Sequence, residues 1–270
     1  MYLLGIDNGT TVTKAALFDL AGREIAVGSE EVGLKHPEPG WAEQSMDEIW
    51  QAVVKAIRQC LAEAAVDPAE VAGISLSGHG GGVWLLDGEG RPVRDAIIWL
   101  DARAKSYLDQ WAEDGRLDEL YDESGWSLFP GIGPCIIYPW LLENEPESLE
   151  SAAVDLSSKD WIKYCLTGEF STDPTMASIA HMNYDSADYS DRVLELSGIT
   201  AYRHLLPPLV PAWQVAGRVT AAAEAENGHS AGTPVASGAW DGVCSPVGAG
   251  GTGVGEAASV IGTAGVHVVV

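Results

Sequence analysis

The chain opens with two apolar runs on either side of a short polar turn, within Leu3 to Asp19. The first run ends at Asp7, and the second ends at Asp19, just before a turn signal at Ala21 and Gly22. Apolar runs of this length, bounded by turn residues, are typical of strands. The opening therefore predicts a buried β-hairpin, which commits this part of the chain to a sheet.

The predicted hairpin turn combines residue types that suit a phosphate group. Gly9 lets the backbone approach a ligand closely, because it has no side chain. Ionised Asp7 cannot donate a hydrogen bond, so beside a phosphate it requires a cation, and hydrated Mg²⁺ fits best. An ordinary polar turn is the alternative, since short Gly/Thr motifs often match by chance. The side chains that can donate to phosphate oxygens are Thr10, Thr11, Thr13 and Lys14.

Asp-Asn-Gly-Thr-Thr at residues 7–11 resembles the first phosphate motif of the sugar kinase, Hsp70 and actin superfamily. The resemblance implies an α/β fold with a ribonuclease-H-like domain, in which a mixed five-stranded sheet is flanked by helices. It also implies that ATP binds between two such domains. The motif does not distinguish the branches of the superfamily, so the rest of the chain has to.

A glycine-rich segment, Gly78 to Gly82, follows a predicted buried strand at residues 71–77. Glycine is entropically unfavourable in ordered structure, which favours close approach of a small ligand over a tight structural bend. Residues 83–103 then predict two strands around an Asp-Gly turn, and they end in Trp-x-Asp-x-Arg. This pattern resembles the sugar-binding region of xylulokinase-type FGGY carbohydrate kinases. The resemblance implies a substrate framed by His79, Gly80, Gly81, Trp99, Asp101 and Arg103.

This region departs from Gly-Gln-Met-His-Gly, the pattern common in the family. His79 stands at the glutamine position and Gly81 at the histidine position. The departure argues against D-xylulose itself, and glycine-rich versions of the loop resemble the L-xylulose kinase and erythritol kinase branch. We interpret His79 as a polar sugar contact rather than a catalytic base, because the sequence shows no partner for it. Trp99 either stacks on a carbon face of the sugar or belongs to the core.

A second decisive stretch covers residues 233–244, where a predicted strand ends at Gly238 and a helix is expected to begin at Asp241. It resembles the Gly-x-x-Asp segment that supplies the catalytic base in FGGY kinases. The resemblance implies that Asp241 contacts the substrate and accepts a proton from its attacking hydroxyl. An aspartate that merely caps a helix is the alternative.

Residues 256–267 repeat the pattern of the opening hairpin, with strands around Gly-Thr-Ala-Gly. This resembles the second phosphate motif of the family, which implies that Gly262 and Thr263 contact the phosphates from the opposite side. We therefore expect an N-terminal ribonuclease-H-like domain at residues 1–250 and the start of a second domain at 251–270. The resemblance covers about the first half of a typical family member.

Several helices are predicted from periodicity and caps. Ser45 and Glu48 have the spacing of a capping box, and apolar residues recur at helical spacing from Ile49 to Leu61. Further helices are expected at residues 104–113, 136–145 and 190–196, and residues 156–170 predict a helix that ends in a glycine C-cap.

Composition limits the class of protein. Hydrophobic residues make up 46% of the 270 residues, which suits a globular core. The net charge of −24 repels nucleic acid and anionic membranes, so neither is expected as a partner. No apolar run has the length of a membrane span and no leader is recognisable, so a cytoplasmic location is expected. The four cysteines form no Cys-x-x-Cys motif, so no zinc site is expected.

The resemblance as a whole implies an enzyme that phosphorylates a sugar or polyol hydroxyl, such as that of a pentulose or tetritol, with ATP and Mg²⁺. The chain is expected to be inactive alone, because it holds only part of the nucleotide site. A homodimer is left open. The alternatives are an Hsp70- or actin-like ATPase that moves a partner, and a sugar-binding domain without catalysis.

Overall fold

The computed structural model describes residues 1–179, 181–261 and 265–269. The opening hairpin is present as predicted, with β1 (Tyr2–Asn8) antiparallel to β2 (Val12–Asp19). β3 (Glu24–Glu31) extends it as a third antiparallel strand. Alternate residues of β1, such as Leu4 and Ile6, are almost fully buried, as expected for a sheet with one covered face.

The main sheet has the order β11-β12-β5-β1-β2-β3, and β13 also pairs with β5. It is mixed, because β5 lies parallel to β1, β12 and β13, whereas the other pairs are antiparallel. The remaining strands are β5 (Val71–Gly78), β11 (Val215–Arg218), β12 (Pro234–Ala236) and β13 (Ala239–Trp240).

The expected five-strand count is therefore too low, because this sheet has seven strands. Five of them, β3, β2, β1, β5 and β12, form the expected mixed sheet, and β11 adds an antiparallel edge. β13 arises because the chain turns at Gly238, which has a φ of +73°. This left-handed conformation suits glycine and lets β12 and β13 share one side of β5.

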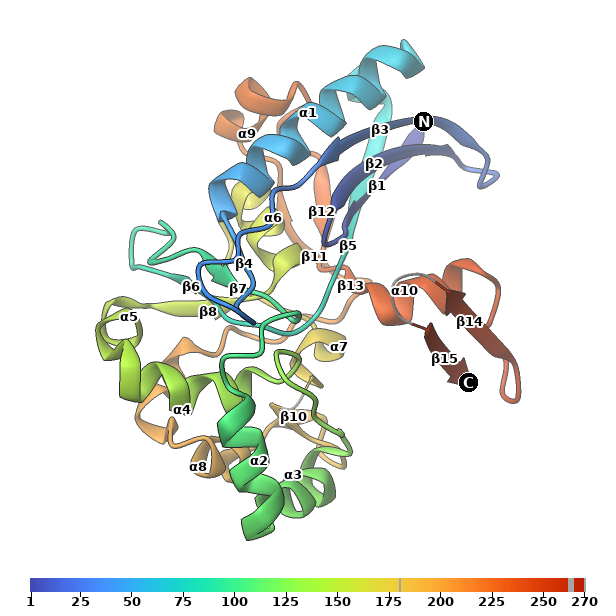
Figure 1. The fold of residues 1–270 in the computed structure, drawn as a ribbon. Helices are drawn as coiled ribbons and strands as arrows, with labels where there is room; N and C mark the ends of the chain where they lie inside the picture. Colours follow the sequence, from blue (N-terminus) through green and yellow to red (C-terminus); the bar gives the residue numbers. More distant parts are fainter. Residues whose placement is uncertain (180, 262–264, 270) are drawn as a thin grey trace.

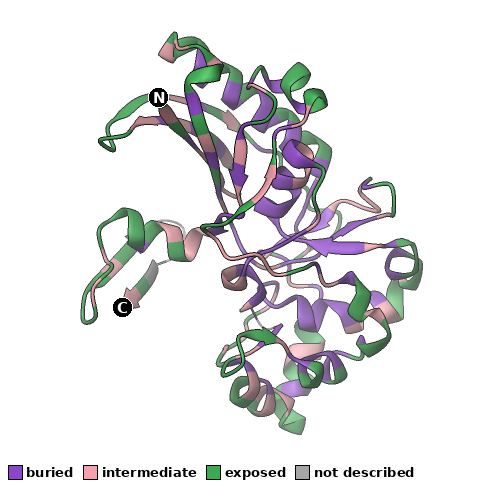
Figure 2. Ribbon diagram, turned by 180° about the vertical axis from the view of Figure 1, so that it is seen from behind, coloured by how far each residue is buried: buried purple, intermediate pink, exposed green. Residues whose placement is uncertain are grey.

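Three helices pack together on one face of the sheet: α1 (Met46–Ala64), α6 (Ser158–Thr167) and α9 (Ala221–Asn227) (Figure 1). α1 begins at the predicted cap, where Ser45 Oγ accepts a hydrogen bond from the Glu48 N–H at 3.3 Å. Its buried side chains join those of β1, β2 and β5 in one apolar core. Figure 2 shows these buried positions gathered between the helices and the sheet.

Much of the chain between β5 and β11, but not α6, forms a second, mainly helical lobe with its own apolar core (Figure 1). The predicted helix at 136–145 begins two residues earlier, because Pro134 suits a first helical turn where its missing N–H is not needed. The helices here are α2 (Lys105–Asp114), α3 (Arg116–Ser124), α4 (Pro134–Asn144), α5 (Pro146–Ser151), α7 (Pro174–Ala177) and α8 (Asp191–Leu196).

Short strand pairs and 3₁₀ turns complete the connections. The pairs are β4 (Glu43–Gln44) with β7 (Ala96–Ile97), β6 (Trp84–Leu86) with β8 (Val154–Leu156), and β9 (Met182–Asn183) with β10 (Asp188–Tyr189). The 3₁₀ turns are η1 (Pro68–Glu70) and η2 (Thr200–Leu205).

The last described elements project from the rest of the molecule (Figure 1). They are α10 (Asp241–Gly248) and a hairpin of β14 (Ala257–Ile261) and β15 (Gly265–Val269). Val254, between α10 and β14, is 98% exposed. A domain boundary near residue 250 stays a prediction. Within the described ranges, no helix combines the length and the hydropathy that a membrane crossing requires.

Candidate active site

Three strands end at the same edge of the sheet. In the parallel ladders, Gly78 of β5 pairs with Asn8 of β1 on one side and with Trp240 of β13 on the other. The residues at these ends therefore come together, although they are far apart in the sequence. Asp7, His79 and Asp241 are the titratable residues at the three ends. The carboxyl edge of parallel strands is the usual place for a ligand site in α/β folds.

The hairpin turn between β1 and β2 supplies backbone donors. The Gly9 N–H bonds the Val12 carbonyl at 3.1 Å, and a Cβ at Gly9 would lie 2.9 Å from that oxygen. Within the described residues, the N–H groups of Thr10 and Thr11 have no hydrogen-bond acceptor. Lys14 is exposed and lies opposite Asp7 in the β1–β2 register. The turn thus offers two free amides and a cation beside a carboxylate.

The environment of Thr13 does not match its predicted role as a phosphate contact. Its side chain is fully buried, and its hydroxyl donates to the Asp7 carbonyl at 3.2 Å. The reason is the alternation of side chains along β2, which turns Thr13 to the covered face and Lys14 to the open face. We therefore assign Thr13 to support of the turn.

Asp241 is the first residue of α10 and is partly exposed. Burial and, to a lesser extent, the nearby Asp7 carboxylate raise the pKa of its carboxyl from 3.8 to about 6, against an opposing hydrogen bond from the Gly242 N–H. The residue before the helix is Trp240, and no side chain caps this helix end. The geometry therefore does not support the alternative of a capping aspartate. Instead, the carboxylates of Asp241 and Asp7 lie close enough to interact electrostatically.

The glycine-rich loop packs closely against Trp240, the residue before Asp241, and against Ile132 and Ile179. A Cβ at Gly80 would lie 2.8 Å from the Trp240 ring and 2.2 Å from Ile179 Cδ1. Gly81 has a φ of +77°, and a Cβ there would lie 2.3 Å from the Ile132 carbonyl oxygen. Glycine is required at both positions, since any other side chain would displace its neighbours.

His79 is 4% exposed and lies at the base of the loop. Its N–H bonds the Asn8 carbonyl at 3.1 Å, and its carbonyl accepts from Ser158 Oγ at 2.7 Å. Neither ring nitrogen has a partner among the described residues. Burial lowers the pKa of His79 to about 4, so the imidazole is neutral at physiological pH.

A group of side chains that we call the tryptophan cluster flanks Asp241. Trp126 and Trp240 meet edge to face, with ring centroids 5.7 Å apart. Trp99 Nε1 donates to Thr10 Oγ1 at 2.9 Å, which connects the cluster to the hairpin turn. Trp126 and Trp240 are not among the residues predicted from the sequence, although the position of Trp240 directly before Asp241 was a usable signal. The cluster consists of Trp99, Trp126, Trp240, Leu128, Ile132, Met176 and Ile179.

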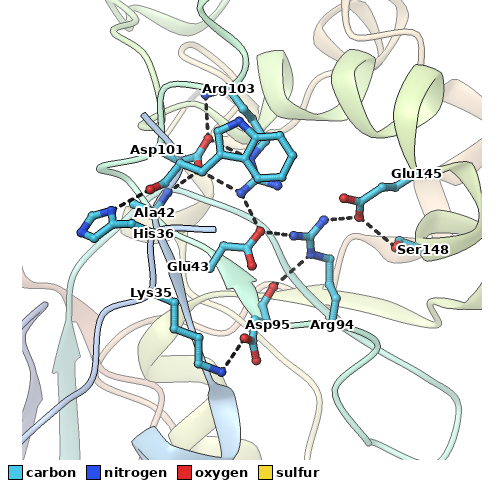
Figure 3. Close-up of polar contacts among 11 residues, drawn as sticks. Lys35, His36, Ala42, Glu43, Arg94, Asp95, Asp101, Arg103, Glu145 and Ser148 are labelled. Carbon is cyan, nitrogen blue, oxygen red and sulfur yellow. Dashed lines mark hydrogen bonds and ion pairs between the residues drawn. The ribbon is translucent and has the colours of Figure 1, made fainter. Parts of the chain in front are cut away.

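Asp101 and Arg103 lie in a buried polar network and not, as predicted, around the substrate (Figure 3). Their side chains are 1% and 0% exposed, and they bond each other at 2.9 Å. Asp101 also accepts from the Ala42 N–H at 2.6 Å, and Arg103 reaches Glu43 at 2.6 Å. The Arg103 guanidinium lies 3.9 Å from the Trp41 ring centroid. The two residues therefore fix the loop that carries Trp99, because their charges are neutralised inside this network.

A second buried network lies on α6, below the strand ends. Lys159 and Lys163 each bond Asp160 at 2.7 Å, and Lys159 also reaches Asp173 at 3.0 Å. Burial opposes ionisation, but the two lysines hold the pKa of Asp160 below its ordinary value. Lys159 Nζ donates to the Ser237 carbonyl at 3.1 Å, which ties α6 to the strand leading to Asp241. The full burial of these three side chains indicates a structural role for this network.

The N-terminal domain of the FGGY family of carbohydrate kinases matches residues 2–248. The chain belongs to this family. Membership confirms the predicted fold class and the predicted family. The predicted phosphate contacts Gly262 and Thr263 lie outside the described residues.

The FGGY relatives include a probable L-xylulose kinase of Pasteurella multocida, 38% identical over 89% of this chain and 50% of the relative. The erythritol kinase of Brucella abortus is 35% identical over 98% of this chain and 51% of its own length. The structure is similar to that of a xylulose kinase from Rhodospirillum rubrum, with a TM-score of 0.91 and 28% identity. That match covers 98% of this chain and 54% of the other. The chain thus spans about half the length of these relatives.

Proposed function

We propose that this domain contributes the acceptor site and the general base of an ATP-dependent kinase for sugars or polyols. The observation that supports this most is the position of Asp241 at the strand ends, where burial and the Asp7 carboxylate raise its pKa. A base with a pKa of about 6 is ionised at neutral pH and still basic enough to accept a proton from a hydroxyl. Asp241 would hold that proton while the hydroxyl oxygen attacks the γ-phosphorus.

The hairpin turn is suited to the phosphates of ATP. The free N–H groups of Thr10 and Thr11 and the ammonium of Lys14 would bind and orient phosphate oxygens. The two carboxylates Asp7 and Asp241 repel each other, and such a pair favours a divalent cation near by. Mg²⁺ takes oxygen ligands and often binds through a single carboxylate plus phosphates, which fits Asp7. When bound, it would neutralise phosphate charge.

The acceptor would lie beside Asp241, next to the glycine-rich loop and the partly exposed rings of the tryptophan cluster. The bond between Trp99 and Thr10 supports this arrangement, because it holds the cluster against the phosphate turn. The partly exposed backbone at Gly81 can approach sugar hydroxyls, and the buried His79 ring at the base of the loop has nitrogens without a partner among the described residues. The names of the relatives make pentuloses and tetritols the first substrates to test.

We further propose that residues 1–250 form the N-terminal domain and that residues 251–270 begin a second domain. Gly262 and Thr263 would then contact the phosphates from the second domain. The relatives are about twice as long, which supports a requirement for chain beyond these 270 residues. Closure of two domains is a common way to complete a phosphoryl-transfer site.

A substrate screen of the full-length protein tests this proposal. ATP-dependent phosphorylation of a pentulose or tetritol is expected, and Asp241→Asn should lower turnover by about two to four orders of magnitude, the usual contribution of a general base. Asp191→Asn is a matched control, because Asp191 is also the first residue of a short helix, α8. Binding of sugar without any phosphorylation would instead favour the sugar-binding domain without catalysis.

A further inference from the structure

A short connecting segment, residues 237–240, leads from β12 to Asp241 and contains β13. It turns at Gly238, where a Cβ would lie 2.1 Å from the Leu76 carbonyl oxygen. β13 has only two residues, so its parallel ladder with β5 supplies few hydrogen bonds. The position of Asp241 therefore depends on contacts that other elements make with this segment.

Thr175 holds the end of the connecting segment next to Asp241. The Trp240 N–H donates to Thr175 Oγ1 at 2.9 Å. Thr175 belongs to α7, which lies beside β13 although it is distant in sequence (Figure 1). Because Trp240 directly precedes Asp241, this bond fixes the backbone from which the Asp241 side chain extends.

A buried ion pair connects Thr175 with the other end of the segment. The Asp173 carboxylate accepts the Thr175 N–H at 2.8 Å and caps α7. Its second oxygen lies 3.0 Å from Lys159 Nζ. The same ammonium donates to the Ser237 carbonyl at 3.1 Å. Lys159 thus reaches the segment directly at Ser237, and through Asp173 and Thr175 at Trp240.

The helix that carries Lys159 also holds the glycine-rich loop. Ser158, the first residue of α6, donates to the His79 carbonyl at 2.7 Å. Lys159 is fully buried and lies 2.7 Å from Asp160. Hydrogen bonds to ionised groups are short and strong, so this network resists displacement. The loop and the segment leading to Asp241 are therefore both positioned by the start of α6.

We propose that Thr175 is a positioning residue for phosphoryl transfer, whose hydroxyl sets the place of Asp241 through the Trp240 backbone. The buried pair of Lys159 and Asp173 holds Thr175 in turn. This inference rests on the proposed function, in which Asp241 is the general base. A base must lie within hydrogen-bond reach of the hydroxyl that it deprotonates, and a misplacement of about 1 Å can lower the rate about 100-fold.

Two substitutions in the full-length protein separate the hydroxyl of Thr175 from its shape. Thr175→Val keeps the branched side chain but removes the acceptor oxygen, whereas Thr175→Ser keeps the oxygen. The kcat of the valine variant should fall about 10- to 100-fold, and the serine variant should retain most of the wild-type kcat. The acceptor KM should change little in either variant, because the Trp240 ring still packs against Trp126.

Thr167→Val is a matched control. Thr167, the last residue of α6, also accepts a backbone N–H through its hydroxyl, that of Glu169 at 3.2 Å. Its loss should leave kcat unchanged, even where it lowers the melting temperature. Kinetics are measured well below the melting temperature of each variant. If Thr175→Val does not fold, Thr175→Ala is compared with Thr175→Ser, since these two differ by a single oxygen.

A low kcat without the Thr175 hydroxyl, together with normal kcat in the serine variant and the control, supports the inference. Wild-type kcat without the hydroxyl overturns it, as does a rise in acceptor KM alone. An equal loss of kcat in Thr175→Ser or Thr167→Val also overturns it. In each of these cases phosphorylation by the wild type leaves the proposed kinase function standing. A folded wild type that phosphorylates no sugar or polyol overturns the proposed function and this inference with it.

Discussion

Replacing Asp241 with asparagine should increase stability and abolish most activity at once. The carboxyl has a pKa of about 6 in the folded protein, against an ordinary value of 3.8. The ionised form is therefore less favourable in the folded state than in the unfolded state. A separation of about two pKa units corresponds to about 3 kcal/mol at neutral pH. Because Asp241 is partly exposed, solvent reduces this to ~1–2 kcal/mol.

The pH dependence has a definite sign. Below pH 4 both states of the wild-type carboxyl are largely protonated, so the variant gains nothing there. As the pH rises from 4 to 6, the unfolded state loses its proton first, and wild-type stability falls relative to Asp241→Asn. Above pH 7 the difference should be constant. Urea denaturation at pH 4 and at pH 7.5, without nucleotide or Mg²⁺, measures it.

Turnover of the same variant completes the test. Loss of the general base should lower the rate of sugar phosphorylation by Asp241→Asn about two to four orders of magnitude below that of the wild type, although the variant is more stable. Asp191→Asn, the control on α8, loses only an exposed ion pair with Arg203 and should show no pH-dependent gain. An Asp241→Asn protein that is less stable at pH 7.5, or that turns over normally, would refute the reasoning.

Four further predictions follow from the same geometry. The kcat/KM of the full-length protein should fall below about pH 6, and Asp7→Asn should move that midpoint to lower pH, because it removes the charge that raises the pKa of Asp241. Asp160→Asn should destabilise the fold by about 3–5 kcal/mol in chemical denaturation, since it leaves two buried lysines short of a partner, whereas exposed Asp122→Asn should not. Gly80→Ala should raise the acceptor KM about 10- to 100-fold in steady-state assays, because its Cβ would displace the Trp240 ring. The 270 residues alone should form no sugar phosphate at a useful rate in a coupled ADP assay; efficient product formation would contradict the need for a second domain.

Much of the fold was predictable because its signals are local. Caps, turn residues and apolar periodicity act over a few neighbouring residues, so the opening hairpin, α1 and the first residue of α10 could be located from sequence. The number of strands in the seven-stranded sheet could not be predicted in this way. β13 has two residues, and it exists only because the chain turns at Gly238 beside β5.

The same distinction between local and long-range signals applies to the site. The sequence by itself determined which residue types stand at the strand ends, including Asp7 and Asp241. Only the tertiary structure decided what they do to each other, since electrostatic coupling depends on distance and burial across separate strands. It also turned Thr13 into the covered face and enclosed Arg103 between Asp101 and Glu43. A side chain's chemistry is set by its residue type, but its availability to a ligand is set by the partners that folding brings to it.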